Sequence, residues 1–286
     1  MKESDKQAQA LKLDLVEFCA TRGDAGKWLN EKLNQVFDER TFFLAFGMAP
    51  KKFDRESVVW SEALKTRLRE VNPDFEKVVW TLDELARLAM LLHLPANGNV
   101  ATIEKLVGSA DRRELVLVYK SMPFLLNAEA FKWLYADGIR TNMVDVFDSI
   151  VLHNSFASEY LDEAAWNQMV LKAIFMERPI FKIYKLDARK NDSLALILHD
   201  FVKERWAAGR LVSPELWRMI DGFASGEMLE SARKETESGT DVAKIAAAKV
   251  LLGAGMGESF SKALAQTAEK TSWDSIGEQV LALQEA

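Results

Sequence analysis

Apolar residues recur along most of this chain at intervals of three and four positions, the spacing that places them on one face of an α-helix. Strand-like alternation is nearly absent, and the β-branched runs SVVW and KVVW are short and flanked by helix formers. Helix starts are marked as well: Thr81 precedes Glu84, and Asp111 precedes Glu114, by the three residues of a capping box. The pattern predicts an all-α chain.

The predicted helices are joined by short turns. Turns rich in Pro, Gly or Asn, as at 95–98 and Pro123, favour stacked antiparallel helical hairpins, either α-solenoid-like or an irregular helical bundle. No repeat of fixed period is evident. The predicted helices cover 5–22, 24–46, 57–71, 81–93, 100–107, 111–121, 127–136, 142–153, 162–176, 191–209, 214–222, 226–236, 241–252, 257–270 and 274–284.

The stretch SGEMLESARKETESGTD, residues 225–241, differs from its surroundings because it is charged and rich in small residues. Such a composition is typical of a linker. We therefore expect a main helical domain over 1–224, a charged linker over 225–241 and an Ala-rich helical cap over 242–286.

Composition narrows the class of protein. A chain of 286 residues with 49% hydrophobic side chains can bury a sizeable core. The net charge is −6 with scattered Lys and Arg, which argues against a nucleic-acid partner. The lone Cys19 cannot form an intrachain disulfide and fits a reducing compartment.

Nothing in the sequence predicts export or membrane insertion. Charges interrupt the N-terminal stretch where a secretory leader would be apolar. The most apolar segments, LARLAMLLHL and IAAAKVLL, are about half as long as the roughly 20 residues of a spanning helix. We expect a cytoplasmic protein that does not span a membrane.

Three segments in one order carry a family resemblance: RTNMVDVFDSIVLHNSF (140–156), YLDEAAWNQMVLKAIF (160–175) and LDARKNDSLALILHDFVKERWAAGRLVSPELWR (186–218). The sequences of these segments resemble those of the EboA family, and a looser similarity extends the resemblance to about residues 75–220. The chain departs from the family sequences at residues 154–157, where family members often have NPYP, and at 201–203, where a histidine-rich spelling is frequent.

The resemblance implies a setting rather than a reaction. EboA-like proteins look like cytoplasmic products of a bacterial gene cluster for a secondary metabolite, beside a UbiA-like membrane prenyltransferase, a TatD-like metal hydrolase, a sugar-phosphate cyclase and TIM-barrel proteins. The family is associated with moving an aromatic pigment precursor towards the periplasm. The implied partners are pathway proteins, including that prenyltransferase, and an anionic or aromatic small molecule.

Arg205 is the sharpest clue among the residues themselves. It falls within about 20° of the centre of the predicted apolar face of its helix, so a carboxylate or several carbonyls are expected near it. Asp145, Asp148 and Glu215 are the candidate partners. Two readings stay open: a structural ion pair that fixes helix crossing, or a pocket in which Arg205 receives a phosphate or carboxylate. The apolar face comprises Leu194, Ile197, Leu198, Phe201, Val202 and Ala208.

The opposite face of the same helix carries His199, Lys203, Trp206 and Arg210 as one stripe. The stripe is either a solvated face with a half-covered Trp or a ligand or interface surface, since Trp and Arg are typical of interaction hot spots.

The remaining candidates also have two readings each. Asn142 is expected to cap its helix, with Asp145 favourable in the first turn, while Asp145 and Asp148 together could act as acid and base or hold Mg²⁺. Side-chain amides at 167 and 168 orient a ligand or satisfy backbone groups. The full set of ligand or interface candidates is Arg140, Asn142, Asp145, Asp148, Asn154, Trp166, Asn167, Gln168, Lys172, Arg189, Asn191, His199, Glu204, Arg205, Trp206, Arg210, Glu215 and Trp217.

We predict no metal and no cofactor, because His93, His153 and His199 lack metal-site spacing and the GAGMG run follows an Ala-rich helix rather than a strand. The main hypothesis is a non-catalytic small-molecule-binding or scaffold module of a metabolite pathway. The alternative is a metal-independent enzyme whose pocket combines Arg205, Asp145, Asp148 and Asn167 on an anionic or aromatic intermediate; catalytic residues are unknown.

Overall fold

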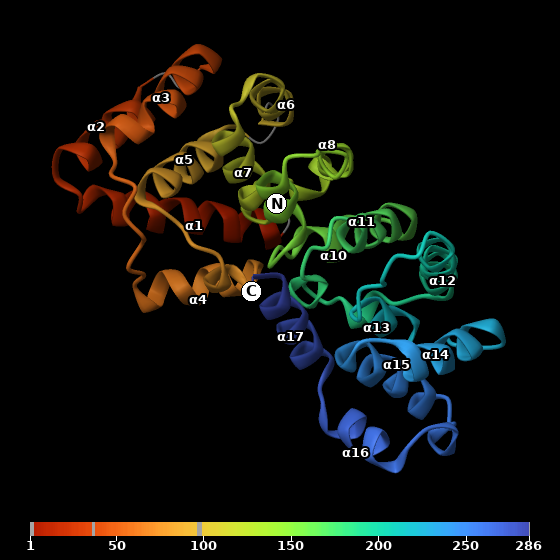
Figure 1. Ribbon diagram of the computed structural model, residues 1–286. Helices are drawn as coiled ribbons and strands as arrows, with labels where there is room; N and C mark the ends of the chain where they lie inside the picture. The colour runs from red at the N-terminus through yellow and green to blue at the C-terminus, as the bar shows by residue number, and fades with distance from the viewer. Residues whose placement is uncertain (1–2, 36–37, 96–98, 286) are drawn as a thin grey trace. The chain divides into compact units, whose positions relative to one another are not determined.

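The structure is a computed structural model that describes residues 3–35, 38–95 and 99–285. Within these ranges the chain forms α-helices and short 3₁₀ turns and no β-strand, apart from an isolated bridge between Ser57 and Thr81 (Figure 1). The all-α fold class is confirmed. The stacking of hairpins stays a prediction.

The chain divides into two compact units, unit 1 (Met1–Leu161) and unit 2 (Asp162–Ala286). Unit 1 holds α1 (Glu3–Ala20), α2 (Gly23–Asn34), α3 (Glu39–Lys52), α4 (Glu62–Val71), η1 (Phe75–Lys77), α5 (Leu82–His93), α6 (Asn99–Ser109), α7 (Arg112–Ser121), η2 (Met122–Phe124), η3 (Ala128–Phe131), α8 (Lys132–Gly138), α9 (Val144–Val151) and α10 (Phe156–Tyr160).

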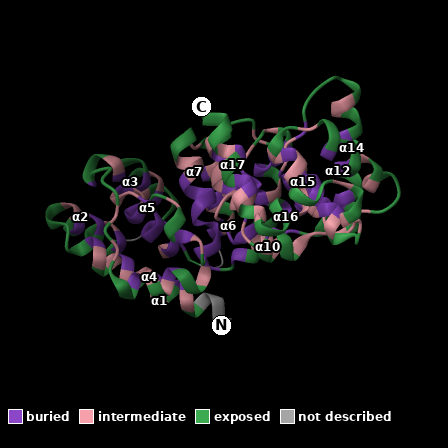
Figure 2. Ribbon diagram, turned by 60° about the horizontal axis from the view of Figure 1, so that its bottom comes forward, coloured by how far each residue is buried: buried purple, intermediate pink, exposed green. Residues whose placement is uncertain are grey.

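Helix α5 packs against α1 and α3 in unit 1. In the same unit, α7 packs against α9. Because every α5 residue from Leu85 to Leu92 is buried, its segment LARLAMLL is a core helix of this unit, as Figure 2 shows by colour. The predicted capping boxes hold α5 and α7 at their first turns: Glu84 accepts from the Thr81 N–H at 2.9 Å, and Glu114 from the Asp111 N–H at 3.1 Å.

Unit 2 holds α11 (Glu163–Phe175), η4 (Ile180–Lys182), η5 (Asp187–Arg189), α12 (Asp192–Ala207), α13 (Leu216–Ile220), α14 (Glu227–Ser238), α15 (Asp241–Gly253), η6 (Gly257–Ser259), α16 (Lys262–Lys270) and α17 (Trp273–Glu285).

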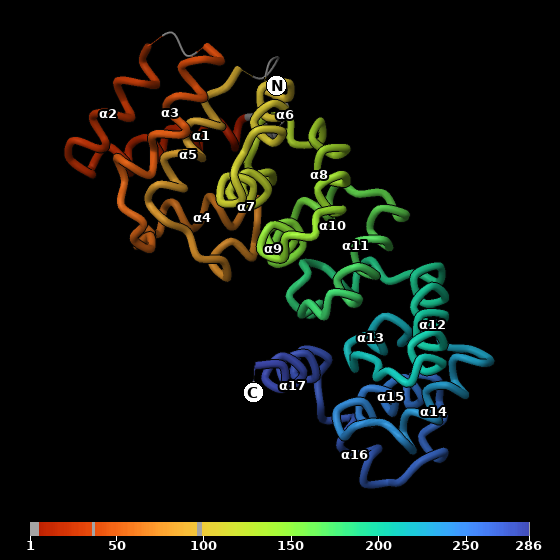
Figure 3. Tube along the Cα trace, turned by 45° about the horizontal axis from the view of Figure 1, so that its top comes forward, coloured from red at the N-terminus to blue at the C-terminus, as the bar shows by residue number. Residues whose placement is uncertain are grey.

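Helix α15 is the hub of unit 2. It packs against α13, α14, α16 and α17, and these neighbours can be followed along the trace in Figure 3. Four alanines of α15 are buried, and their small side chains let adjacent helices approach closely. They are Ala243, Ala246, Ala247 and Ala248.

Two predicted segments differ from the observed elements. The predicted helix 24–46 is wrong as one helix: α2 ends at Asn34, and Asp38 starts α3 by accepting from the Thr41 N–H at 2.8 Å, with residues 36–37 outside the described ranges. The stretch predicted as a linker contains α14, which buries Ala232, and the division into compact units falls after Leu161. The domain bounds at 224 and 241 stay a prediction. Residues 96–98 of the predicted turn at 95–98 also lie outside the described residues.

Among the described residues, no helix combines the length and the apolar character needed to cross a bilayer.

Candidate functional site

A cavity of about 220 Å³ lies in unit 2 and is lined mainly by apolar side chains; we call it the Arg205 pocket. Its apolar lining comes from α11, α12, the turn after α12, α15 and α17: Ile174, Phe175, Phe201, Leu211, Val212, Pro214, Val242, Ala243, Val280 and Leu283. Its polar lining consists of Glu177, Arg205, Ser213, Glu235, Thr240 and Gln284. An apolar cavity with a few polar groups is the usual form of a small-molecule site.

Arg205 is half-buried on this wall and not at the centre of a buried face, which corrects the sequence prediction. Helix α12 buries Leu194, Ala195, Leu198, His199 and Val202, so its inward face is turned towards His199. With this face of α12 inward, Ile197 is exposed and Arg205 lies at the edge of the buried face.

The partner of Arg205 is a single carbonyl. Its Nε donates to the Leu211 oxygen at 3.0 Å, and its guanidinium carbon lies 5.9 Å from the centre of the Phe201 ring. Among the described residues of unit 2 it forms no ion pair with a carboxylate, so Glu215, which accepts from the Phe181 N–H, is not its partner. The other two predicted partners, Asp145 and Asp148, belong to unit 1. The two terminal nitrogens therefore keep their donors for another group.

The predicted exposed stripe on α12 is wrong at its first member. His199 is buried, and its Nε2 lies 2.9 Å from the Ser231 hydroxyl; burial lowers the pKa of this imidazole, as does nearby Lys203. Trp206 is half-buried with the Lys234 ammonium 4.6 Å from its ring centre. Arg210 and Glu204 are exposed.

The amides predicted on α11 separate into two environments. Asn167 is buried and exchanges hydrogen bonds with Asn191 at 3.1 and 2.9 Å, and Asn191 also caps α12 by accepting from the Leu194 N–H at 2.8 Å. These amides therefore satisfy one another and a helix end. Gln168 is exposed and Lys172 half-buried.

Trp166 and Trp217 are fully buried, and neither indole N–H finds an acceptor among the described residues. The Arg189 guanidinium carbon lies 4.6 Å from the centre of the Trp166 ring. Neither Trp lines the Arg205 pocket, so both are core residues of unit 2.

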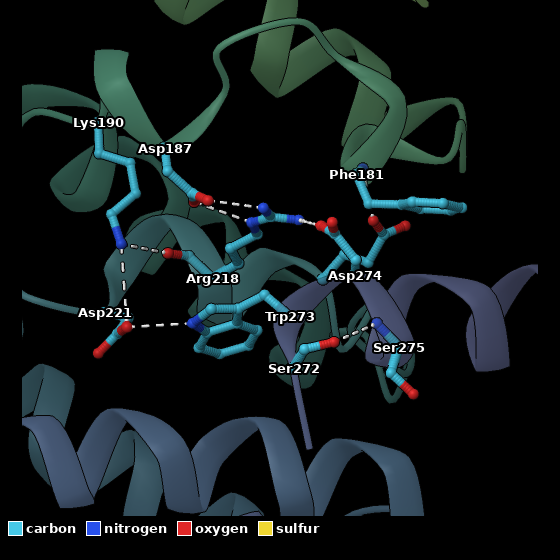
Figure 4. A network of polar contacts seen from close by, with 10 residues as sticks. Phe181, Asp187, Lys190, Arg218, Asp221, Ser272, Trp273, Asp274 and Ser275 are labelled. Carbon is cyan, nitrogen blue, oxygen red and sulfur yellow. Dashed lines mark hydrogen bonds and ion pairs between the residues drawn. The ribbon is translucent and has the colours of Figure 1, made fainter. Parts of the chain in front are cut away.

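A polar network that the sequence did not predict joins α13, η5 and the start of α17 (Figure 4). Arg218 donates to both Asp187 carboxylate oxygens, at 2.8 and 2.6 Å, and to Asp274 at 2.7 Å. Beside it, the Trp273 indole donates to Asp221 at 3.1 Å. The signal was present, because Arg218 stands within the otherwise apolar run LWRMI of a buried helix.

Glu215 lies next to this network and is buried. It accepts from the Phe181 N–H at 2.8 Å, and a Cβ on Gly277 would come within 2.9 Å of its Oε1 and 2.3 Å of the Phe181 ring. Burial raises the pKa of Glu215 to about 7, against the lowering effect of the Phe181 N–H and of Arg218. The residue supports the packing of α17 and does not line the Arg205 pocket.

In unit 1, the candidates around α9 are mostly solvated. The predicted cap Asn142 is wrong, because Met143 precedes the first helical residue and Asn142 is exposed. Arg140 makes a loose exposed pair with Asp137 at 3.5 Å, and Asp145 pairs with Arg112 at 3.2 Å. Asp148 is half-buried and has a partner of its own.

Asp145 also lines a separate, polar cavity of about 330 Å³ in unit 1, together with Arg55, Arg87, Arg112 and Arg113. Each carboxylate on this wall is already engaged; for example, Glu84 binds Lys120 at 2.7 Å. Asp145 lies in unit 1 and Arg205 in unit 2, and the two line different cavities, so the enzyme pocket that would combine them stays a prediction.

Asn154 is a buried structural clamp of unit 1. Its amide donates to the carbonyls of Tyr119 at 3.1 Å and Ser149 at 2.9 Å, and its oxygen accepts from the Phe156 N–H at 3.0 Å. We expect Asn154→Ala to lower the free energy of unfolding by about 2 kcal/mol, because buried carbonyls lose their donor. Urea unfolding measures this, with exposed Asn142→Ala as the control expected within about 0.5 kcal/mol of wild type. Equal effects of the two substitutions would contradict the clamp.

Comparison with known proteins gives one result. Residues 15–221 match the EboA family, described as "Metabolite traffic protein EboA". No curated protein matches the chain. No solved structure matches it either. The matched region contains Arg205 and the α11 and α12 sides of its pocket, whereas the α14, α15 and α17 sides lie beyond it. With most of its length matched, this chain belongs to the EboA family.

Proposed function

We propose that this protein is a non-catalytic accessory module of metabolite traffic, and that it holds a small anion with an apolar body in the Arg205 pocket. One observation carries the proposal: the Arg205 guanidinium lines an apolar cavity, and no carboxylate among the described residues of unit 2 pairs with its terminal nitrogens. Hydrogen bonds between such donors and an anion are strong, and a largely apolar wall weakens competition from water.

The size of the cavity supports a metabolite-sized ligand. A dry apolar cavity of about 150 Å³ holds a benzene molecule. At about 220 Å³ the Arg205 pocket accommodates a somewhat larger molecule, of the order of ten non-hydrogen atoms. Phe175, Leu211 and Leu283 remain exposed although they line the pocket, which gives an apolar body a surface to meet on entry.

The setting is part of the proposal. The family description, metabolite traffic, accords with a module that binds and passes on a pathway intermediate. We place that module in the cytoplasm, docking another protein of the pathway such as a UbiA-like membrane prenyltransferase. A scaffold that binds no small molecule is the competing form of the same accessory role.

Calorimetric titration with octanoate tests the pocket, because octanoate joins a carboxylate to an apolar chain of suitable size. We expect Arg205→Met to weaken octanoate binding about 10- to 100-fold, because the variant loses one or two charge-assisted hydrogen bonds to the carboxylate. Octan-1-ol should bind the wild-type protein more weakly than octanoate, and Arg205→Met should erase that difference.

Arg210→Met is the matched control, because Arg210 is exposed at the end of the same helix and does not line the pocket. It should bind octanoate as the wild type does. Equal losses in both variants would show only an effect of net charge, and absence of octanoate binding would contradict the proposal. Recovery of unchanged ligand after incubation is expected for a module that does no chemistry.

A further inference from the structure

Glu235 is the buried acidic side chain of the Arg205 pocket, whose other acid, Glu177, is exposed. It lies in the last turn of α14, is 6% exposed and lines the cavity. No hydrogen bond or ion pair of its carboxyl group is seen among the described residues, and Arg205 donates to the Leu211 oxygen instead. Because the carboxyl lines the cavity, its polar atoms are open to a polar group of a ligand that enters there.

The fold keeps this carboxyl in place. Gly239 follows the helix, and a Cβ at that position would lie 2.9 Å from the Glu235 Oε1 and 2.7 Å from its backbone oxygen. Only a residue without a side chain leaves that space, so the glycine and the buried carboxyl form one local arrangement.

The environment also restricts which group can meet Glu235. Burial raises the pKa of this carboxyl above its ordinary value, opposed by Lys234, and the C-terminal end of a helix disfavours a negative charge. An ammonium group needs the ionised acid and a carbonyl needs the protonated one. A hydroxyl group both donates and accepts, so it fits the carboxyl in either state.

We infer that Glu235 is a second polar recognition point of the Arg205 pocket, and that the ligand is a hydroxy acid: its anionic group meets Arg205 and its hydroxyl meets Glu235, with an apolar body between them. The inference rests on the proposed function of the pocket and adds the class of ligand. The two side chains line one cavity, so a single ligand held there can meet both.

Calorimetric titration with octanoate and a panel of hydroxyoctanoates, each with the hydroxyl at a different carbon, tests this inference without assuming a distance. We expect at least one panel member to bind the full-length protein about 3- to 10-fold tighter than octanoate, the usual contribution of one hydrogen bond. Glu235→Met, of similar size but without a hydrogen-bonding group, should bring the ratio of hydroxyoctanoate to octanoate affinity to about one, whatever its effect on octanoate itself. Glu235→Gln should retain part of the preference.

Glu237→Met is the control, because Glu237 is exposed on the same helix and outside the pocket. It should keep the hydroxyl preference, and thermal unfolding should show that the Glu235 variants remain folded. If octanoate binds but no hydroxyoctanoate binds tighter, or if the preference survives Glu235→Met, the inference is overturned and the proposed function stands. If no acid of the panel binds, the proposed function itself fails.

Discussion

Arg218→Met is expected to lower the free energy of unfolding by about 3 kcal/mol. The side chain of Arg218 is 9% exposed, and it binds Asp187 through two parallel hydrogen bonds and Asp274 through a third. Removing a buried ion-pair partner costs more than removing an exposed one, because the acids lose their counter-charge inside the fold. We place the effect at the lower end of the usual range because Asp187 and Asp274 are half-exposed and can be rehydrated.

The substitution should also release one end of α17. Asp274 lies in the first turn of α17, and Arg218 lies in α13, so their pair ties the C-terminal helix to the matched part of the chain. Val280, Leu283 and Gln284 of α17 line the Arg205 pocket. Hydrogen exchange should therefore speed up in α17 before the rest of unit 2, and octanoate affinity should fall with it.

Urea unfolding and site-resolved hydrogen exchange are the measurements. Arg218→Lys keeps the charge but cannot form the two-pronged contact with Asp187, so it should recover only part of the stability. Arg233→Met provides a control on an exposed pair with Glu230, where a change under about 1 kcal/mol is expected. An Arg218→Met protein as stable as this control would show that the network contributes nothing to stability.

The helical content follows from local sequence because caps and periodicity act over a few residues. Asp162 accepts from the Ala165 N–H at 2.9 Å at the predicted start of α11, and Asn191 caps α12 at the start of the helix predicted over 191–209. The break between α2 and α3 was missed for a related reason: Asp38 is a cap signal within a run that otherwise keeps helical spacing.

The candidate site was only partly predictable, since the inward face of a helix is chosen by its neighbours. A helical wheel for α12 weighs apolar residues alone, and it cannot anticipate that Ser231 receives His199 inside unit 2. Arg205 was identified, but its environment was predicted only in part: a carboxylate or several carbonyls were expected, and one carbonyl, that of Leu211, accepts from it. Glu235 gave no signal, because its neighbours in RKETESG are all polar or small.

The residues of the EboA-like motifs and the residues that line the Arg205 pocket are therefore two different sets that share only some members. The EboA-like motifs supply Arg205, but they also include Asn167 and Asn191, whose amides are used within the fold. A shared motif in this chain marks structural clamps as readily as ligand contacts, and hydrogen-bond partners distinguish the two.

Glu215→Gln is expected to stabilise the protein at alkaline pH relative to acidic pH. In the folded chain the pKa of Glu215 lies at about 7, against 4.5 for the unfolded chain, because burial penalises its charged form. A carboxyl whose folded pKa is raised favours the folded state fully below the unfolded pKa, and that contribution is lost as pH rises from about 4.5 to about 7. Above about pH 7 the free energy of unfolding is therefore lower by about 3 kcal/mol, since each unit of pKa difference is worth about 1.36 kcal/mol.

Glutamine is uncharged at every pH and its oxygen can still accept from the Phe181 N–H, so the variant should escape this loss. The difference in unfolding free energy between variant and wild type should therefore shift by about 2 to 3 kcal/mol in favour of the variant between pH 5 and pH 8. Urea unfolding at both pH values measures that shift, and the cost of the substitution itself cancels in the comparison.

Exposed Glu204→Gln on α12 is the control, and its effect should not change between the two pH values by more than about 0.5 kcal/mol. A pH-independent effect of Glu215→Gln would contradict a carboxyl kept protonated by burial. The expected shift would instead show that α17, which packs its Gly277 on Glu215, is held most firmly when that acid is neutral. Because α17 forms one wall of the Arg205 pocket, hydrogen exchange in α17 should then rise across the same pH window in the wild type and stay flat in the variant.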